Sequence, residues 1–223
     1  MSDTVDSEEV RAWRVAQRLT ELRGEERANL IRIVGIAGFY GVQLLNRYGV
    51  ALGPVQIPAM EGVEGSFHLL MSLLALTGVL VASGVLIALR NRFFPWWIKY
   101  ATSTVDLVLA SIALVVADGP SSPLVVIFFP LLGLSVLRFS QSLVRYTTCA
   151  TIVAYLFVAL AALRDRPTLA VPLYQAILFV LALAIVGVAL DHVAREVRRL
   201  AGAYADRASR VPAAPSADAE GGT

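Results

Sequence analysis

Charged residues are scarce in this chain. Asp, Glu, Lys and Arg make up 16% of its 223 residues, whereas hydrophobic residues make up 57%. A soluble domain of this size carries about a quarter charged residues. The deficit excludes an ordinary soluble globular domain and predicts an integral membrane protein. With a net charge of only +2, we expect the lipid bilayer as the main partner and no nucleic acid.

Cysteine and histidine are almost absent too. Cys149 is the only cysteine, which excludes an intrachain disulfide and a thiolate metal site. Its apolar neighbours predict a small buried side chain. His68 and His192 are the only histidines and fall near opposite faces of the predicted membrane, so they cannot share a metal or a haem.

Catalytic motifs are also missing. The sequence has no Gly-x-Ser-x-Gly nucleophile turn and no Gly-rich loop of the kind that binds phosphates. We therefore predict a protein that is not an enzyme and that holds no cofactor or metal.

Long hydrophobic runs are what the chain has in abundance. Six of them cover residues 30–46, 67–89, 98–117, 122–137, 143–163 and 171–190. A transmembrane helix needs about 20 apolar residues, so the first and fourth runs are short. Pro130 near the middle of the fourth run predicts a kink. The predicted fold is an all-α integral membrane bundle of six helices, with a cytoplasmic amphipathic helix at each end.

The composition divides the chain into four parts. Residues 1–29 form a predicted cytoplasmic amphipathic segment, in which Val15, Leu19 and Leu22 recur at helical spacing. Residues 30–190 form the six-span domain, and residues 191–210 form a charged helix that leaves the membrane. Residues 211–223 are rich in Pro, Ala, Gly and Ser, which predicts a disordered tail.

Basic residues indicate the orientation. If the N-terminus is inside, 16 of the 19 Arg and Lys residues fall on the cytoplasmic side, which predicts a bacterial inner-membrane protein with both termini in the cytoplasm. The loop between the second and third spans combines aromatic and basic side chains, the pattern of an interfacial anchor. The residues of this predicted anchor are Arg92, Phe94, Trp96, Trp97 and Lys99.

The longest predicted connection is the outer loop of residues 47–66. A connection of this length is either functional, in which case it would contact a ligand outside the membrane, or a poorly ordered linker. Both interpretations remain open on the sequence alone.

Asp106 is the one acidic residue well inside a predicted span. An intramembrane carboxylate is costly and needs a partner. Arg138 and Arg145, at the inner ends of the fourth and fifth spans, are the predicted partners. The alternative is local hydrogen bonding to Ser103 or Thr104 on the same helix.

Small residues mark one surface of the first span. Gly35, Gly38 and Gly41 recur there, and small residues allow helices to approach closely in lipid. They predict a packing interface, either within the bundle or between protomers.

The charged helix after the sixth span carries a short apolar seam. Its residues are Val193, Val197, Leu200 and Tyr204, at spacings of four, three and four. This seam predicts a homodimer in which the two helices meet. The alternative is a solvated basic helix with its arginines at the lipid headgroups.

Residues 99–155 resemble part of the six-span sensor region that precedes bacterial histidine kinases and class III adenylate cyclases. The resembling motifs are Asp106-Leu107, the turn Asp118-Gly119-Pro120-Ser121-Ser122-Pro123-Leu124, the span end Leu137-Arg138-Phe139-Ser140, and Ala154-Tyr155-Leu156. The phosphoacceptor, ATP-binding and cyclase regions of those proteins have no counterpart in this sequence.

The resemblance and the predicted topology imply a non-enzymatic membrane sensor or anchor. It would relay a membrane or extracytoplasmic signal to a cytoplasmic signalling protein through the helix after the sixth span. The alternative is a small transporter or channel that uses an intramembrane Asp/Arg pair.

Overall fold

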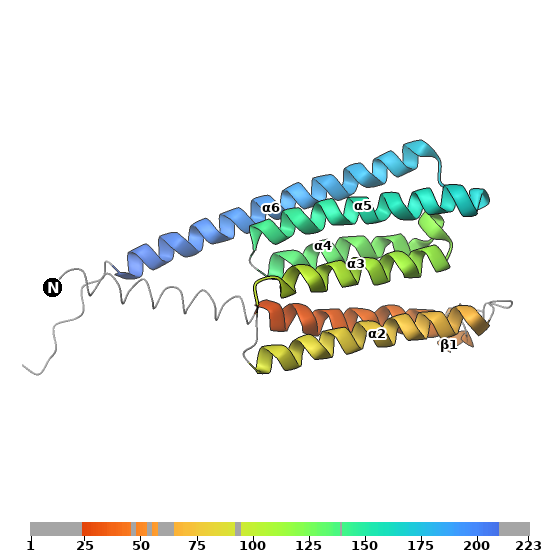
Figure 1. Ribbon diagram of the computed structural model, residues 1–223, viewed down its shortest axis with the longest axis horizontal. Coiled ribbons are helices and arrows are strands. Elements are labelled where there is room, and N and C mark those ends of the chain that lie inside the picture. The colour runs from red at the N-terminus through yellow and green to blue at the C-terminus, as the bar shows by residue number, and fades with distance from the viewer. Residues whose placement is uncertain are drawn as a thin grey trace, which may run out of the picture.

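A computed structural model describes residues 24–45, 48–52, 55–57, 65–91, 95–138 and 140–209. Figure 1 shows long helices lying side by side along one axis. In chain order the elements are a first helix (Gly24–Leu45), β1 (Val50–Leu52), β2 (Val55–Ile57), α2 (Gly65–Arg90), α3 (Ile98–Val116), η1 (Gly119–Ser121), η2 (Pro123–Ile127), α4 (Phe128–Leu137), α5 (Gln141–Asp165), η3 (Pro167–Leu169) and α6 (Leu173–Ser209).

Five of the described helices are long and apolar enough to cross a membrane: the first helix, α2, α3, α5 and α6. The fourth predicted span is instead a shorter segment, in which the five-residue 3₁₀ helix η2 leads into the ten-residue α4. Pro130 therefore lies in the first turn of α4, where a helix needs no N–H donor. The change from 3₁₀ to α-helix falls at Phe128, two residues before this proline, and the predicted kink at Pro130 stays a prediction.

Helices α3 to α6 form the best-packed part of the molecule. Their buried core includes Leu114, Phe128, Leu132, Tyr155 and Leu183. The Phe128 and Tyr155 rings meet edge to face at 6.4 Å between centroids. Helices α5 and α6 approach closely at Gly187, where an added Cβ would collide with the side chain of Thr148.

The first helix and α2 form a hairpin that lies beside α3 (Figure 1). The two helices meet where Gly78 of α2 leaves room for Ile36, whose Cδ1 atom would lie only 2.8 Å from a Cβ at that position. Tyr40 and Ser72 also share a hydrogen bond of 2.8 Å between their hydroxyls. The all-α class is confirmed by these helices, and the connection between the first helix and α2 also contains the short antiparallel pair β1–β2.

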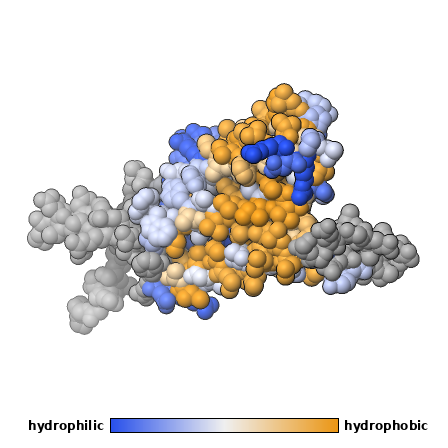
Figure 2. All heavy atoms as spheres, turned by 45° about the vertical axis from the view of Figure 1, so that its right-hand side comes forward, coloured by the Kyte–Doolittle hydropathy of each residue, from blue (hydrophilic) through white to orange (hydrophobic). Residues whose placement is uncertain are grey.

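Apolar side chains cover much of the outside of the bundle. Figure 2 shows a broad hydrophobic surface over its middle, with hydrophilic residues toward its ends. Large exposed hydrophobic side chains of the molecule include Leu69, Leu160, Leu173 and Ile185. A soluble monomer rarely exposes so much contiguous apolar surface, so the surface agrees with the five apolar helices in indicating a membrane protein. Cys149 is exposed on α5, and its predicted burial is wrong.

The predicted boundaries at residues 29/30 and 190/191 both fall inside continuous helices. The first described helix begins at Gly24 and runs through residue 29, and α6 runs without interruption through residues 190 and 191. The remainder of the predicted N-terminal segment and the predicted tail lie outside the described residues.

Candidate functional site

Three polar side chains share one face of the first helix. Glu25, Asn29 and Arg32 are separated by four and three residues, so they stack along the same side. Their exposed fractions are only 1%, 0% and 4%. Because these three polar side chains are shielded from the outside, they must find their partners inside the protein.

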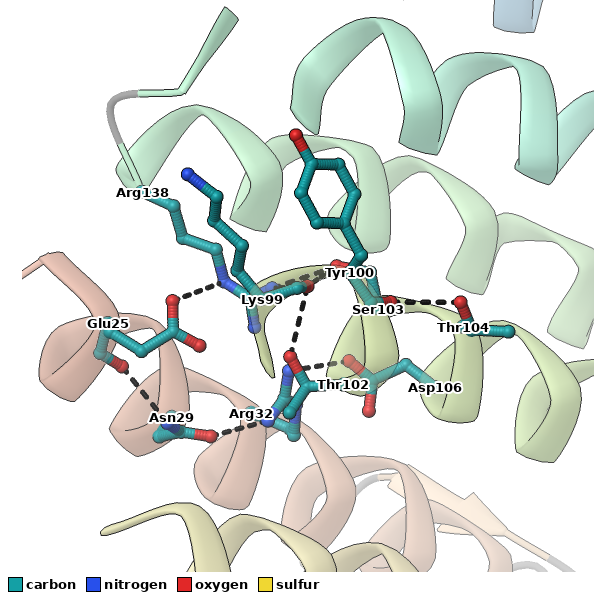
Figure 3. A network of polar contacts seen from close by, with 10 residues as sticks. All are labelled: Glu25, Asn29, Arg32, Lys99, Tyr100, Thr102, Ser103, Thr104, Asp106 and Arg138. Carbon is teal, nitrogen blue, oxygen red and sulfur yellow. Dashed lines mark hydrogen bonds and ion pairs between the residues drawn. The ribbon is translucent and has the colours of Figure 1, made fainter. Parts of the chain in front are cut away.

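The first partner is Asp106 on α3. Arg32 Nη2 lies 2.7 Å from Asp106 Oδ2 in a buried ion pair (Figure 3). Arg32 also donates a hydrogen bond to Asn29 Oδ1, and Asn29 Nδ2 donates to the backbone carbonyl of Glu25 at 3.1 Å. Asp106 is eight residues into α3, so the pair lies about 12 Å along the helix from its start.

The second partner is Arg138 at the end of α4. Its Nε atom lies 3.0 Å from Glu25 Oε2, and both side chains are buried. Arg138 Nη1 donates to the backbone carbonyl of Lys99 at 2.7 Å and to Ser103 Oγ at 2.8 Å. This arginine therefore joins the first helix, α3 and α4 at one end of the bundle.

Two carboxylates and two guanidinium groups balance the charge of this network, which is defined here by Glu25, Asn29, Arg32, Asp106 and Arg138. Glu25 Oε1 and Arg32 Nε are nevertheless buried without a hydrogen-bond partner among the described residues. An incompletely satisfied buried network costs stability. Its presence at the junction of three helices makes it the candidate functional site.

The predicted partners of Asp106 are wrong. Arg138 pairs with Glu25, and Arg145 lies 3.2 Å from Asp191 of α6 in a separate, more exposed pair. Local hydrogen bonding is also not what satisfies Asp106, because Ser103 and Thr104 donate to the backbone carbonyls of Lys99 and Tyr100.

Sequence reasoning missed the residues on the first helix. By sequence, Arg32 is one of the basic residues on the predicted cytoplasmic side, and Glu25 and Asn29 fall in the segment of residues 1–29 that is predicted to precede the membrane. The available signal was the spacing of Glu25, Asn29 and Arg32, which repeats the period of one helix face.

A cavity of about 330 Å³ lies next to the network. Arg32 and Asp106 line one end of it, and Tyr40 and Gln43 line the other. The remaining lining residues are apolar and come from the first helix, α2, α3, η2 and α4. Such an apolar space beside a few polar groups is the usual form of a small-molecule site.

The predicted glycine interface is not used within the described chain. An added Cβ at Gly35, Gly38 or Gly41 would meet no atom within 4 Å. The packing interpretation within the bundle is therefore wrong for these glycines, and the interpretation between protomers stays a prediction.

The predicted anchor is only partly described. Trp96 and Trp97 are exposed, as side chains at a membrane surface would be. Lys99 has a second role, since its Nζ donates to Ser140 Oγ at 3.3 Å and its carbonyl accepts from Arg138. Arg92 and Phe94 lie outside the described residues.

The predicted dimer seam is exposed on α6. Val193, Val197 and Leu200 all present large apolar side chains to the outside, and the side chain of Tyr204 lies outside the described part of the structure. Within the described ranges, no group of three or more His, Cys, Asp or Glu residues is arranged to hold a metal ion.

Comparison with known proteins adds no relative. No family model, no curated protein and no solved structure matches this chain.

Proposed function

We propose that this protein is a non-enzymatic sensor or anchor of the bacterial inner membrane. It passes a change in its helix bundle to a cytoplasmic signalling protein through α6. The observation that carries the proposal is the continuity of α6, which is one helix from Leu173 to Ser209. Figure 1 shows it extending beyond the ends of the neighbouring helices.

One part of α6 is held by the bundle. Leu183 is fully buried, Gly187 packs against Thr148, and Asp191 pairs with Arg145 of α5. The part that follows exposes Val193, Val197 and Leu200. A rotation or tilt of the held part would turn these exposed residues with it, because no break in the helix separates the two parts.

The chain crosses the membrane six times in this proposal. Ser121 Oγ donates to the carbonyl of Leu169 at 2.7 Å, so η1 and η3 lie at one end of the bundle. Arg138 reaches Lys99 at the other end. The segment from Pro123 to Leu137 thus returns the chain across the bundle, and the distribution of basic residues favours both termini in the cytoplasm.

The protein acts as a homodimer in this proposal, with two copies of α6 meeting along the seam. A seam of this length is too short to form a stable isolated coiled coil, so the membrane bundle would hold the two helices together. The resemblance to six-span sensor regions supports the same function. Single cysteines along α6, crosslinked in membranes, test the proposal directly.

A transporter or channel is the second candidate. The supporting observation is the Arg32–Asp106 pair, which lines a cavity inside the bundle. A transporter of protons or ions should show uptake in proteoliposomes that Asp106→Asn abolishes. Equal uptake by empty liposomes and by liposomes with the wild-type protein would exclude this candidate.

A further inference from the structure

The cavity has the length and direction of a lipid chain. It extends along the first helix from Arg32 to Gln43, which are 11 residues apart and hence about 16 Å along the axis. Half the hydrocarbon thickness of a bilayer is about 15 Å. The cavity therefore matches the depth of one leaflet and runs along the bundle.

The cavity opens to the outside of the bundle. Ile31 of the first helix and Pro130 of α4 both line it, and both are exposed. In a membrane, an opening between these two helices faces lipid. A chain could enter sideways from the bilayer without crossing a polar layer.

The two ends of the cavity differ chemically. At one end Arg32 and Asp106 neutralise each other at 2.7 Å, so this end offers no net charge to a ligand. At the other end Gln43 provides an amide that can donate a hydrogen bond. No cationic side chain among the described residues lines that end, so an ester carbonyl fits it better than a carboxylate.

We propose that this cavity binds one acyl chain of a bilayer glycerolipid. The ester end lies at Gln43, on the side of the β1–β2 hairpin, and the terminal methyl group points toward the Arg32–Asp106 pair. With the N-terminus in the cytoplasm, the lipid belongs to the outer leaflet. This site does not depend on the relay through α6, and its test uses no signalling readout.

Glycines give a matched set of variants. Gly35 and Gly133 line the cavity from the first helix and α4, and an added Cβ at either position would meet no atom within 4 Å. Gly38 has equally open space but does not line the cavity. Leucine favours a helix more than glycine does, so Gly35→Leu and Gly133→Leu should fold while filling the cavity.

The experiment uses the full chain in liposomes that contain a phosphatidylglycerol with a photoreactive diazirine in one acyl chain. After illumination, adducts are located by peptide mass spectrometry. We expect adducts on cavity-lining residues in the wild type, a several-fold loss of these adducts in Gly35→Leu and Gly133→Leu, and no loss in Gly38→Leu. The wild type and the three variants must give matching size-exclusion profiles. If one of the two cavity variants aggregates, the labelling of the other cavity variant is compared with the wild type.

Three results would overturn the proposal. One is labelling of cavity residues that is no stronger than labelling of exposed Leu69 and Leu76 on α2. Another is labelling that is unchanged by both cavity variants. The third is cavity labelling by a diazirine fatty acid but not by the glycerolipid probe, which would assign the site to a free fatty acid.

Discussion

Arg32 of the first helix and Asp106 of α3 form an ion pair of 2.7 Å in which both side chains are largely buried. The two residues are 74 positions apart in the sequence. Asn29 accepts a hydrogen bond from Arg32 and donates one to the backbone carbonyl of Glu25, whose carboxylate pairs with Arg138. The hairpin of the first helix and α2 is thus tied to α3 and α4 by charge at one end, beside the apolar cavity.

Asp106→Ala should strongly destabilise the protein. It leaves Arg32 buried without a counter-charge, and breaking a buried pair costs about 3–5 kcal/mol. Arg145→Ala is the control, because its pair with Asp191 is more exposed and should cost about 0–1 kcal/mol. Thermal unfolding in detergent compares them, and equal losses for the two variants would contradict the assignment.

The double variant Arg32→Leu/Asp106→Leu separates charge compensation from packing. Replacing a buried pair by apolar residues is often neutral for stability. We expect the double variant to unfold at a higher temperature than Asp106→Ala. A double variant that is less stable than Asp106→Ala would mean that the pair contributes more than mutual neutralisation.

Glu25 and Glu26 should differ sharply although they are neighbours. Glu25 is buried against Arg138, whereas Glu26 is exposed. Glu25→Gln removes the charge that compensates Arg138 and should lower the unfolding temperature in detergent. Glu26→Gln should leave it unchanged. If both substitutions are silent, residue 25 lies outside the bundle.

Reporter fusions test the topology. A reporter after Gly202 should be active in the cytoplasm, and one inserted near Gly53 should be active in the periplasm, because basic residues concentrate on the proposed cytoplasmic side. A cytoplasmic signal at Gly53 or a periplasmic signal at Gly202 would overturn the orientation.

Sequence patterns predicted the membrane class and most helices because hydrophobic length depends only on local sequence. The fourth run illustrates the limit. Its apolar residues predict a span. In the structure, Pro123 begins a 3₁₀ helix and the α-helix starts only at Phe128. Hydropathy cannot predict this change of helix type, because both parts are apolar.

The partners in the charge network could not be predicted from the same patterns. The sequence shows that Asp106 needs a partner, but the choice among Arg32, Arg138 and Arg145 depends on which helices are neighbours. Glu25 is predicted to lie outside the membrane because charged residues before a hydrophobic run usually face water. Its burial becomes evident only once Arg138 is brought to it from α4.

The most direct test of the proposed relay is disulfide crosslinking along α6. Single cysteines replace Val197, Leu200 or Arg198 in a Cys149→Ser background, which removes the exposed native thiol. Two copies of α6 that meet along the seam place residues 197 and 200 together and residue 198 apart. We predict covalent dimers in membranes for Val197→Cys and Leu200→Cys but not for Arg198→Cys. Equal crosslinking at all three positions, or none at any, would contradict the account and favour a solvated helix.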